Sequence, residues 1–355
     1  MCLETLETRV VPNNYTVNTL ADTHEADPLI GPGIDSNGNV SLRSAIEDAD
    51  RVGGLSNITF SVQGQINLTE LLSLNLGGPP GSPLTITING GGQITIARPS
   101  GALVPTFRIL EIDGQTNALL VGLGMTNGSE TTGGAILNNG TLNCENLSLF
   151  QNQAGLTGGA IDNESTLSFS AGRISYNSAS IGGGAIFNGG SLTMTNGAEM
   201  DHNTVTAGNG GALINVSAGT ANLNRVLIEN NIANTVNGIG GDGGGIYNTG
   251  SVTMFGGDLQ WNVAGLDGGG IYTSGANASA SFTQVTISYN VAQGGNGPGY
   301  GGGFYLDAGS LSMQSCILQS NTALWGNGGV VNVAGGAVFN NLGENIINDN
   351  IFYIT

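Results

Sequence analysis

Few residues of this chain could do acid–base chemistry, and the best placed of them lie in a stretch of repeated sequence. Asp201 and His202 form the only adjacent acid–histidine pair within that stretch. Glu229 lies about one repeat further along, so the carboxylates of Asp201 and Glu229 could share one edge of stacked repeats. Two carboxylates on one face are what an inverting glycoside hydrolase needs. The alternative is that these side chains belong to a solvated polar face.

A polysaccharide lyase would need other residues, namely acids that bind calcium beside an arginine or lysine that acts as base. All 7 basic residues of the chain are arginines, and only Arg173 and Arg225 lie inside the clear repeats. Arg173 has acidic residues in neighbouring repeats, Glu145 and Glu199, which makes it the candidate base. A surface ion pair is the alternative interpretation.

One short loop has the oxygen-bearing side chains that calcium prefers. Asp35, Asn37 and Asn39 alternate as in the first half of a calcium loop. The glycine of such a loop stands at another place, and the glutamate that would close it is missing. We therefore expect no cofactor, with calcium at this loop as the alternative.

Aromatic residues recur at two positions of the repeat. Tyr247, Tyr272 and Tyr305 occupy one position in three consecutive repeats, and we expect them to form an outward strip that binds glycans or stabilises the coils. Insertions at one corner lie beside this strip, where binding residues often occur: Asn234–Asp242, Gln293–Tyr300 and Leu324–Gly335. Another turn carries further aromatic residues, whose direction the sequence leaves open: Tyr176, Trp261 and Tyr289.

The element that must position these residues is a glycine-rich repeat, Gly-Gly-Ala-Ile or a close variant. Its second glycine recurs every 25 to 33 residues, at Gly134, Gly159, Gly184, Gly211, Gly244, Gly269 and Gly302. An aliphatic residue three places before an asparagine recurs in phase, as in Leu149–Asn152, and short alternating stretches lie between. This pattern predicts three short strands and three turns per repeat. It favours an all-β fold, a right-handed parallel β-helix.

The repeat also predicts which side chains form the core. One inward column contains Ile136, Ile161, Ile186, Leu213, Ile246, Ile271 and Phe304, and another contains Leu142, Leu167, Leu192, Val252 and Leu311. Cys144 and Cys316 align with inward positions, so we expect buried thiols and no disulfide. The repeated asparagines suit turns, because Asn tolerates left-handed backbone and can hydrogen-bond from coil to coil.

The amino-terminal part differs from the repeats. Leu42, Ala45, Ile46 and Ala49 recur at helical spacing after Ser41, which predicts a short capped helix that covers the open end of the core. We divide the chain into residues 1–13, a leader remnant or disordered segment; 14–62, an N-terminal cap; and 63–355, the β-helix, regular from about 133.

The cap region resembles the CSLREA domain. The match is the stretch Val40-Ser41-Leu42-Arg43-Ser44-Ala45-Ile46, followed by Ile58-Thr59-Phe60, within about residues 14–62. Val40 and Ser44 stand where that family has cysteine and glutamate, so the family's usual disulfide is not expected here.

The glycine and asparagine motifs resemble the repeats of the polymorphic outer membrane protein family. In that family a phenylalanine usually stands three places before the asparagine, whereas here the residue is aliphatic. The resemblance implies a passenger domain that acts in adhesion at a cell surface.

Composition bounds the function. The formal net charge is −18 and only 9% of residues are charged, so the surface repels phosphate backbones and we expect no nucleic-acid partner. No apolar run is long enough for a transmembrane segment. We expect an exported protein at or beyond the bacterial surface, with a structural or adhesive role and glycans or cell-surface components as partners. The alternative is a polysaccharide lyase or glycoside hydrolase that acts on acidic or plant or algal polysaccharide. The oligomeric state stays open.

Overall fold

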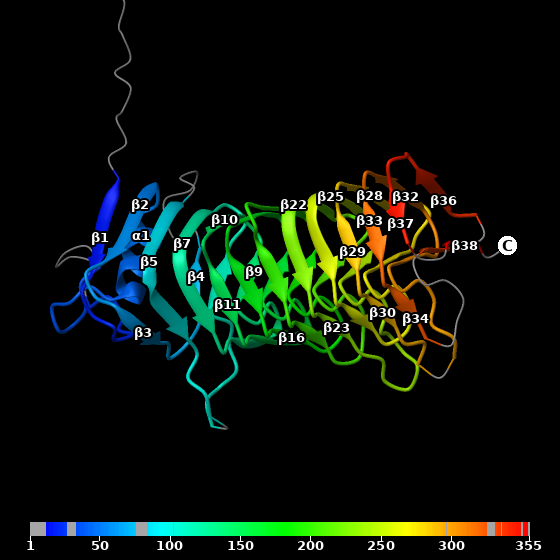
Figure 1. The fold of residues 1–355 in the computed structure, drawn as a ribbon. Coiled ribbons are helices and arrows are strands. Elements are labelled where there is room, and N and C mark those ends of the chain that lie inside the picture. Colours follow the sequence, from blue (N-terminus) through cyan, green and yellow to red (C-terminus); the bar gives the residue numbers. More distant parts are fainter. Residues whose placement is uncertain are drawn as a thin grey trace, which may run out of the picture.

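A computed structural model of the chain describes residues 12–26, 33–75, 84–101, 103–295, 297–324, 331–334, 336–348 and 351–353. The predicted leader segment lies almost wholly outside these residues, as does most of the insertion Leu324–Gly335. The described part is a parallel β-solenoid of about 10 turns with a single short helix near its N-terminus (Figure 1). The predicted fold class is thereby confirmed.

Three parallel sheets run along the solenoid, and the regular coils from β8 onward add strands to all three. The long sheet has 19 strands among the described residues: β1 (Asn13–Val17), β2 (Leu55–Phe60), β3 (Gly64–Asn67), β5 (Thr85–Ala97), β7 (Asn117–Thr126), β10 (Thr141–Glu145), β11 (Ser148–Phe150), β14 (Thr166–Ser170), β15 (Arg173–Ser175), β18 (Ser191–Thr195), β19 (Glu199–Asp201), β22 (Thr220–Glu229), β25 (Ser251–Gln260), β28 (Ser279–Thr283), β29 (Thr286–Ser288), β32 (Ser310–Gln314), β33 (Ile317–Gln319), β36 (Val338–Asn341) and β37 (Ile346–Ile347).

The other two sheets are built from shorter strands. The glycine sheet, which follows the paired glycines, contains β4 (Leu72–Leu74), β6 (Leu110–Ile112), β9 (Ile136–Asn138), β13 (Ile161–Asn163), β17 (Ile186–Asn188), β21 (Leu213–Asn215), β24 (Ile246–Asn248), β27 (Ile271–Thr273), β31 (Phe304–Leu306), β35 (Val331–Val333) and β38 (Ile351–Tyr353). The short sheet, which follows the asparagine turn, contains β8 (Ser129–Thr132), β12 (Gln153–Thr157), β16 (Ser178–Ala179), β20 (Thr204–Val205), β23 (Ile232–Ala233), β26 (Val263–Ala264), β30 (Val291–Ala292) and β34 (Thr322–Ala323).

The predicted inward columns form the core. Ile136, Ile161 and Ile186 pair in register on adjacent strands, and the column continues to Phe304 with every member buried. In the second column Ala221 and Ala280 occupy the coils where the sequence pattern has gaps. Cys144 and Cys316 are both buried free thiols, as expected.

The two glycines of each pair serve different needs. The first has a left-handed backbone in every coil, for example φ 57° at Gly133. The second packs against the next coil so closely that a Cβ would lie 2.3 Å from the Gly159 carbonyl oxygen at Gly134 and 2.1 Å from the Gly184 carbonyl oxygen at Gly159. Any larger residue would push the coils apart, which explains why this tetrapeptide is the most regular feature of the sequence.

Asparagine ladders join the coils at the next turn. The Oδ1 atom of Asn203 accepts hydrogen bonds from the backbone N–H and the Nδ2 atom of Asn177, each at 3.0 Å, and Asn203 bonds Asn231 in the same way. These asparagines are buried. One expectation was wrong: the left-handed residue is the one before each ladder asparagine, such as Tyr176 at φ 56°.

The helix α1 (Leu42–Val52) covers the first coils, and the four apolar residues predicted to face the core, Leu42, Ala45, Ile46 and Ala49, are buried in it. Ser41 caps it, and Ser44 completes a capping box because its Oγ accepts the Ser41 N–H at 2.9 Å. Ser44 thus performs locally what a glutamate at this position performs in other capping boxes. No membrane-spanning helix is found among the described residues.

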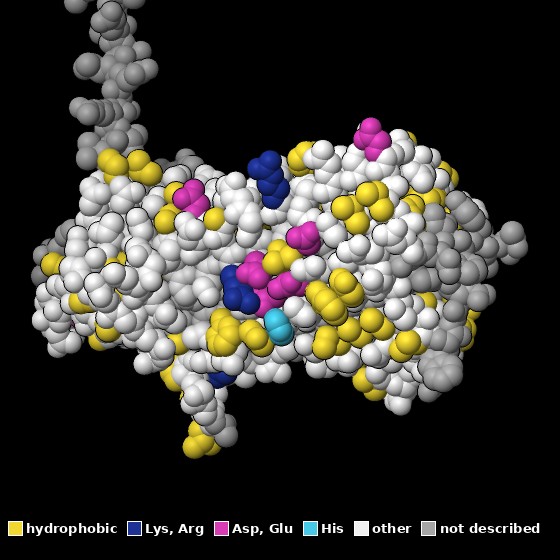
Figure 2. All heavy atoms as spheres, in the orientation of Figure 1, with side chains coloured by type: hydrophobic (Ala, Val, Ile, Leu, Met, Phe, Trp, Pro, Cys, Tyr) yellow, Lys and Arg dark blue, Asp and Glu magenta, His cyan; other side chains and the backbone are white. Residues whose placement is uncertain are grey.

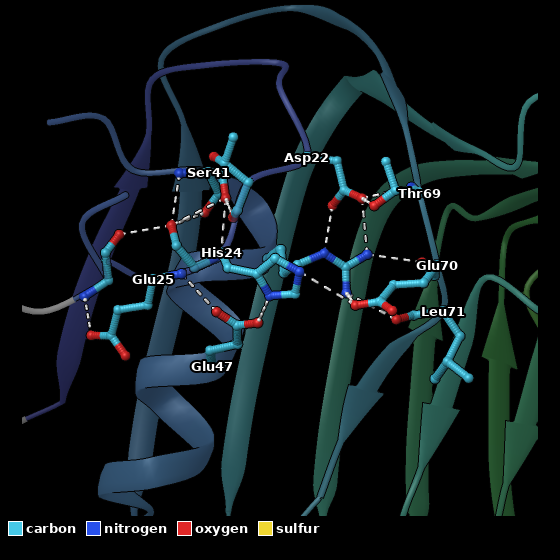
Figure 3. Close-up of polar contacts among 12 residues, drawn as sticks. Asp22, His24, Glu25, Ser41, Glu47, Thr69, Glu70 and Leu71 are labelled. Atoms are coloured by element: carbon cyan, nitrogen blue, oxygen red, sulfur yellow. Dashed lines mark hydrogen bonds and ion pairs between the residues drawn. The ribbon is translucent and has the colours of Figure 1, made fainter. Parts of the chain in front are cut away.

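A buried ion pair fixes this cap to the solenoid (Figure 3). Arg43 bonds both carboxylate oxygens of Asp22, at 2.8 and 2.9 Å, and donates to the carbonyls of Glu70 and Leu71. Burial would raise the pKa of Asp22, but the hydrogen bonds from Arg43 and Thr69 outweigh it and hold that pKa below its ordinary value. The arginine of the CSLREA-like stretch therefore ties the helix to the loops on either side.

Candidate functional site

Most of the exposed aromatic residues in the described part of the chain gather at the asparagine turn, Phe255 being the exception. The residue before each ladder asparagine has a left-handed backbone, with φ between 53° and 59° from Gln151 to Ser320. Its side chain therefore points away from the core while the next residue points in. This settles the direction that the sequence leaves open: Tyr176 and Trp261 are each 49% exposed and Tyr289 is 40% exposed.

These rings form two stacks along the solenoid axis, which we call the exposed ladder. Tyr176 stacks on His202 with ring centroids 4.7 Å apart, and Phe150 meets Tyr176 edge-on at 5.6 Å. Trp261 stacks on Tyr289 at 4.2 Å with nearly parallel planes. Figure 2 shows this face, with a histidine side chain in the middle and hydrophobic side chains on both sides of it along the solenoid. A polymer lying along the axis would meet rings from successive coils.

A charged cluster adjoins the ladder. Arg173 holds Asp201 through two hydrogen bonds, Nε to Oδ1 at 2.7 Å and Nη2 to Oδ2 at 2.6 Å, and lies 3.4 Å from Glu199. His202 Nδ1 contacts the same Asp201 carboxylate at 2.8 Å. Glu229 pairs in register with Asp201 on the adjacent strand and accepts a bond from the Gln260 amide. The four candidate catalytic residues, Arg173, Asp201, His202 and Glu229, thus share one site.

The geometry changes the expected role of Arg173. Its partners are Asp201 and Glu199, whereas Glu145 makes no ion pair with it in the described part of the chain. The hydrogen bonds to Asp201 raise the pKa of the guanidinium well above its ordinary value, so Arg173 stays protonated. Asp201 has a fully buried side chain whose oxygens are already engaged. A base at Arg173 is therefore disfavoured.

Glu199 is an acid of the cluster whose pKa lies above its ordinary value. Burial raises it, and the carboxylates of Asp201 and Glu229 add to the effect, while Arg173 opposes it. Counting Arg173 as +1 and Glu199, Asp201 and Glu229 as −1 each, the cluster carries a net charge of −2 with His202 neutral. It would repel a polyanionic ligand.

The predicted tyrosine strip forms as a column but is less accessible. Tyr247, Tyr272 and Tyr305 pair in register; the rings of Tyr247 and Tyr272 stack at 5.3 Å, and that of Tyr305 lies 5.2 Å from Tyr272 at a tilt of 38°. All three are half-buried. Burial raises their pKa values, with smaller contributions from nearby aspartates, and that of Tyr305 rises to about 12. A binding role for this column stays a prediction.

Aspartates of the insertion corner line this tyrosine column. The Oδ1 of Asp242 accepts the backbone N–H of Asp267 at 3.3 Å, and the Oδ1 of Asp267 accepts that of Tyr300 at 2.7 Å. Burial raises the pKa of Asp242 to about 6. These aspartates thus serve as links from coil to coil beside the buried rings.

The candidate calcium loop is hydrogen-bonded within itself. Asp35 accepts the backbone N–H groups of Asn37 and Asn39, both at 2.8 Å, and the hydroxyl of Thr23 at 2.7 Å. Burial opposes these bonds, yet the pKa of Asp35 stays below its ordinary value. No three acidic, histidine or cysteine side chains of the described residues converge as a metal site. Calcium binding here stays a prediction.

A groove of about 500 Å³ continues the exposed ladder toward the N-terminus. Gly122 and Gly124 form part of its floor, and Asn146, Phe150 and Gln151 line its side. The absence of side chains at the glycines makes the groove, and the amides offer donors and acceptors. Spacing alone could not reveal it, because it arises where β5 and β7 meet β11.

Comparison of the chain with known protein families, curated proteins and solved structures finds no match. The class that stands is the parallel β-solenoid itself. The resemblances to the CSLREA domain and to polymorphic outer membrane protein repeats therefore stay predictions.

Proposed function

We propose that this chain is a non-catalytic glycan-binding protein, exported to or beyond the bacterial surface, that contacts its ligand along the exposed ladder. The observation that carries the proposal is the set of rings at one turn, Tyr176, His202, Trp261 and Tyr289, each 40 to 49% exposed. Large aromatic side chains at the surface are costly to leave in water unless a ligand covers them, and their rings suit the C–H faces of sugars.

The ladder supports an extended ligand. Its residues recur once per coil, and stacked strands are roughly 4.8 Å apart, so one ligand can contact residues of several coils. The groove beside Phe150 and Gln151 lengthens the same surface. The location outside the cell rests on the lysine-free, weakly charged composition.

The alternative is a glycoside hydrolase that uses Glu199 and Glu229. It is favoured by the raised pKa of Glu199, since a general acid needs a pKa near its working pH. Asp201 does not suit this role, because it is bound by Arg173 and His202. An eliminating lyase is less well supported, because its base would have to be a permanently charged Arg173.

The test is titration calorimetry with four soluble hexasaccharides: cellohexaose, chitohexaose, mannohexaose and hexagalacturonate. We expect at least one neutral ligand to bind with a Kd of about 1 mM or tighter, equivalent to about −4 kcal/mol. Hexagalacturonate should not bind, because the charged cluster is acidic. Absence of binding by all four overturns the proposal. Release of new reducing ends from a bound ligand, lost in Glu199→Gln, would establish the hydrolase instead.

A further inference from the structure

The exposed ladder is interrupted in one coil. The left-handed position before the ladder asparagine carries Tyr176, His202, Asn230, Trp261 and Tyr289 in consecutive coils. Asn230 is the single non-aromatic residue in this run. Because the rings of each pair come from adjacent coils and stack, their planes lie across the solenoid axis. The outer face of His202 and the outer face of Trp261 are therefore both turned toward the coil of Asn230.

The usual spacing of stacked coils gives the gap between these two rings roughly the width of a sugar ring. His202 and Trp261 are two coils apart, which is about 9.6 Å at roughly 4.8 Å per coil. A planar aromatic ligand in van der Waals contact at about 3.5 Å on each side would need only about 7 Å. A pyranose chair is thicker, because C–H bonds project from both of its faces, and it fills the gap better.

The floor and one wall of the gap are polar. The Asn230 side-chain amide makes no hydrogen bond with any described residue, while its backbone N–H bonds the Gln260 carbonyl at 3.2 Å. Glu229 and Gln260 are bonded to each other at 3.0 Å at the side of the gap. These groups can accept from and donate to hydroxyls at the rim of a sugar, whereas the acid disfavours a uronic acid.

We infer that the gap at Asn230 is the principal sugar subsite and holds one pyranose between His202 and Trp261. The favoured class is an uncharged, gluco-configured, β-linked sugar, because its equatorial hydroxyls leave C–H bonds on both faces. This inference rests on the proposed function, since it names the ligand class and the place where it binds. It differs from a continuous ladder, in which a ligand would lie across the edges of the rings.

The test fills the gap with a ring. Asn230→Tyr should keep the fold, because Tyr176 and Tyr289 occupy the same position with the same backbone. We expect the affinity for cellohexaose to fall at least about tenfold. Gln284→Tyr adds a ring at a left-handed, exposed position of another turn, away from the exposed ladder and the groove, so it should leave the affinity unchanged. Asn230→Gly keeps the gap and the left-handed backbone, and should weaken binding by roughly threefold through loss of the amide.

Three outcomes overturn the inference separately from the proposed function. If Asn230→Tyr binds cellohexaose as tightly as the parent or more tightly, the ring edges form the platform and glycan binding itself stands. If the parent binds mannohexaose or hexagalacturonate in preference to cellohexaose, the ligand class is wrong. If Asn230→Tyr fails to fold by circular dichroism, the fluorescence of Trp261 decides, measured in a Trp325→Phe variant because the chain has two tryptophans. Cellohexaose must shift this emission, and absence of a shift contradicts the inference.

Discussion

Two aromatic columns run along this solenoid, and they differ in burial. Tyr247, Tyr272 and Tyr305 form a column without a gap beside the insertion corner, in which the first two rings stack and the third is tilted, and all three are half-buried. The exposed ladder at the asparagine turn is more accessible and is interrupted at Asn230. Both columns arise because the repeat places one side chain of each coil at the same position, so that equivalent side chains lie next to each other in adjacent coils.

The difference in burial between the two columns indicates different roles: the buried column stabilises the fold, and the exposed ladder is available to bind a ligand. A ring covered on both faces by its neighbours and shielded from water contributes packing energy, as Tyr272 does between Tyr247 and Tyr305. A ring with a free face contributes little to packing and is available for a ligand, as Trp261 is toward Asn230. Stacking alone therefore does not identify a binding strip. A binding strip is identified by rings that are exposed and by a gap in the column that leaves ring faces free.

The largest effect on stability should come from the buried column. Tyr272→Ala removes a half-buried ring and two stacking contacts, and we expect the free energy of unfolding to fall by about 2 to 3 kcal/mol. Trp261→Ala, the matched control in the exposed ladder, should cost less than about 1 kcal/mol. Denaturant melts followed by circular dichroism measure both. Equal losses would remove the distinction between the columns.

The next effect concerns the ion pair that supports the exposed ladder. Asp201→Asn removes a buried carboxylate held by Arg173 and His202, and we expect a loss of about 1 to 2 kcal/mol, since Arg173 is 50% exposed and can be solvated. A double-mutant cycle with Arg173→Gln measures the coupling. A coupling energy near zero would show that the pair does not hold the turn.

The buried column should also respond to pH. The pKa of Asp242 is about 6 in the folded chain against 3.8 for the free side chain. The folded state therefore binds this proton more tightly, and the stability it gives is present below about pH 4 and lost as the pH rises through 6. We expect acidification from pH 7 to 5 to raise the free energy of unfolding.

The control for this prediction is Asp242→Asn. This substitution should reduce the change of the free energy of unfolding with pH. It should raise that free energy at pH 7 by about 1 kcal/mol, a small value because the group is partly solvated. Asp50 and Asp162 have raised pKa values in the same range, about 7 and about 6, so part of the slope should remain. A slope unchanged in Asp242→Asn would contradict the assignment.

The smallest effect should be that of calcium. The Asp35 carboxylate already accepts three hydrogen bonds, so we expect no calcium ion to bind there. The stability of the chain, including both aromatic columns, should therefore not depend on calcium. Thermal melts with calcium and with a chelator should give Tm values within about 1 °C of each other. A larger rise with calcium that is lost in Asp35→Asn would establish the site.

Much of this architecture could be predicted from the sequence. The glycine pairs recur because a Cβ at a position such as Gly134 would clash with the next coil. The ladder asparagines recur because loss of an amide such as that of Asn203 would remove hydrogen bonds between coils. These two motifs therefore reveal the period of the repeat and the register of the coils. The helix at Leu42–Val52 was also predictable, since its spacing and its cap are local.

The site was less predictable, for physical reasons. The direction of Trp261 depends on a left-handed backbone one residue before the asparagine, and an aromatic residue rarely adopts that conformation. The pairing of Arg173 with Asp201 needed the register of adjacent coils. The burial of Tyr272 depends on the neighbouring coils, which place Tyr247 and Tyr305 on either side of it, and no pattern within one coil specifies this.

The most direct test of the central claim is to titrate one ligand, the tightest of the four hexasaccharides, into Trp261→Ala and Tyr272→Ala under identical conditions. We expect Trp261→Ala to lose at least about tenfold in affinity while remaining folded, and Tyr272→Ala to bind as the parent does once it is folded. Loss of binding in Tyr272→Ala with full binding in Trp261→Ala would place the glycan surface on the buried column and contradict the account.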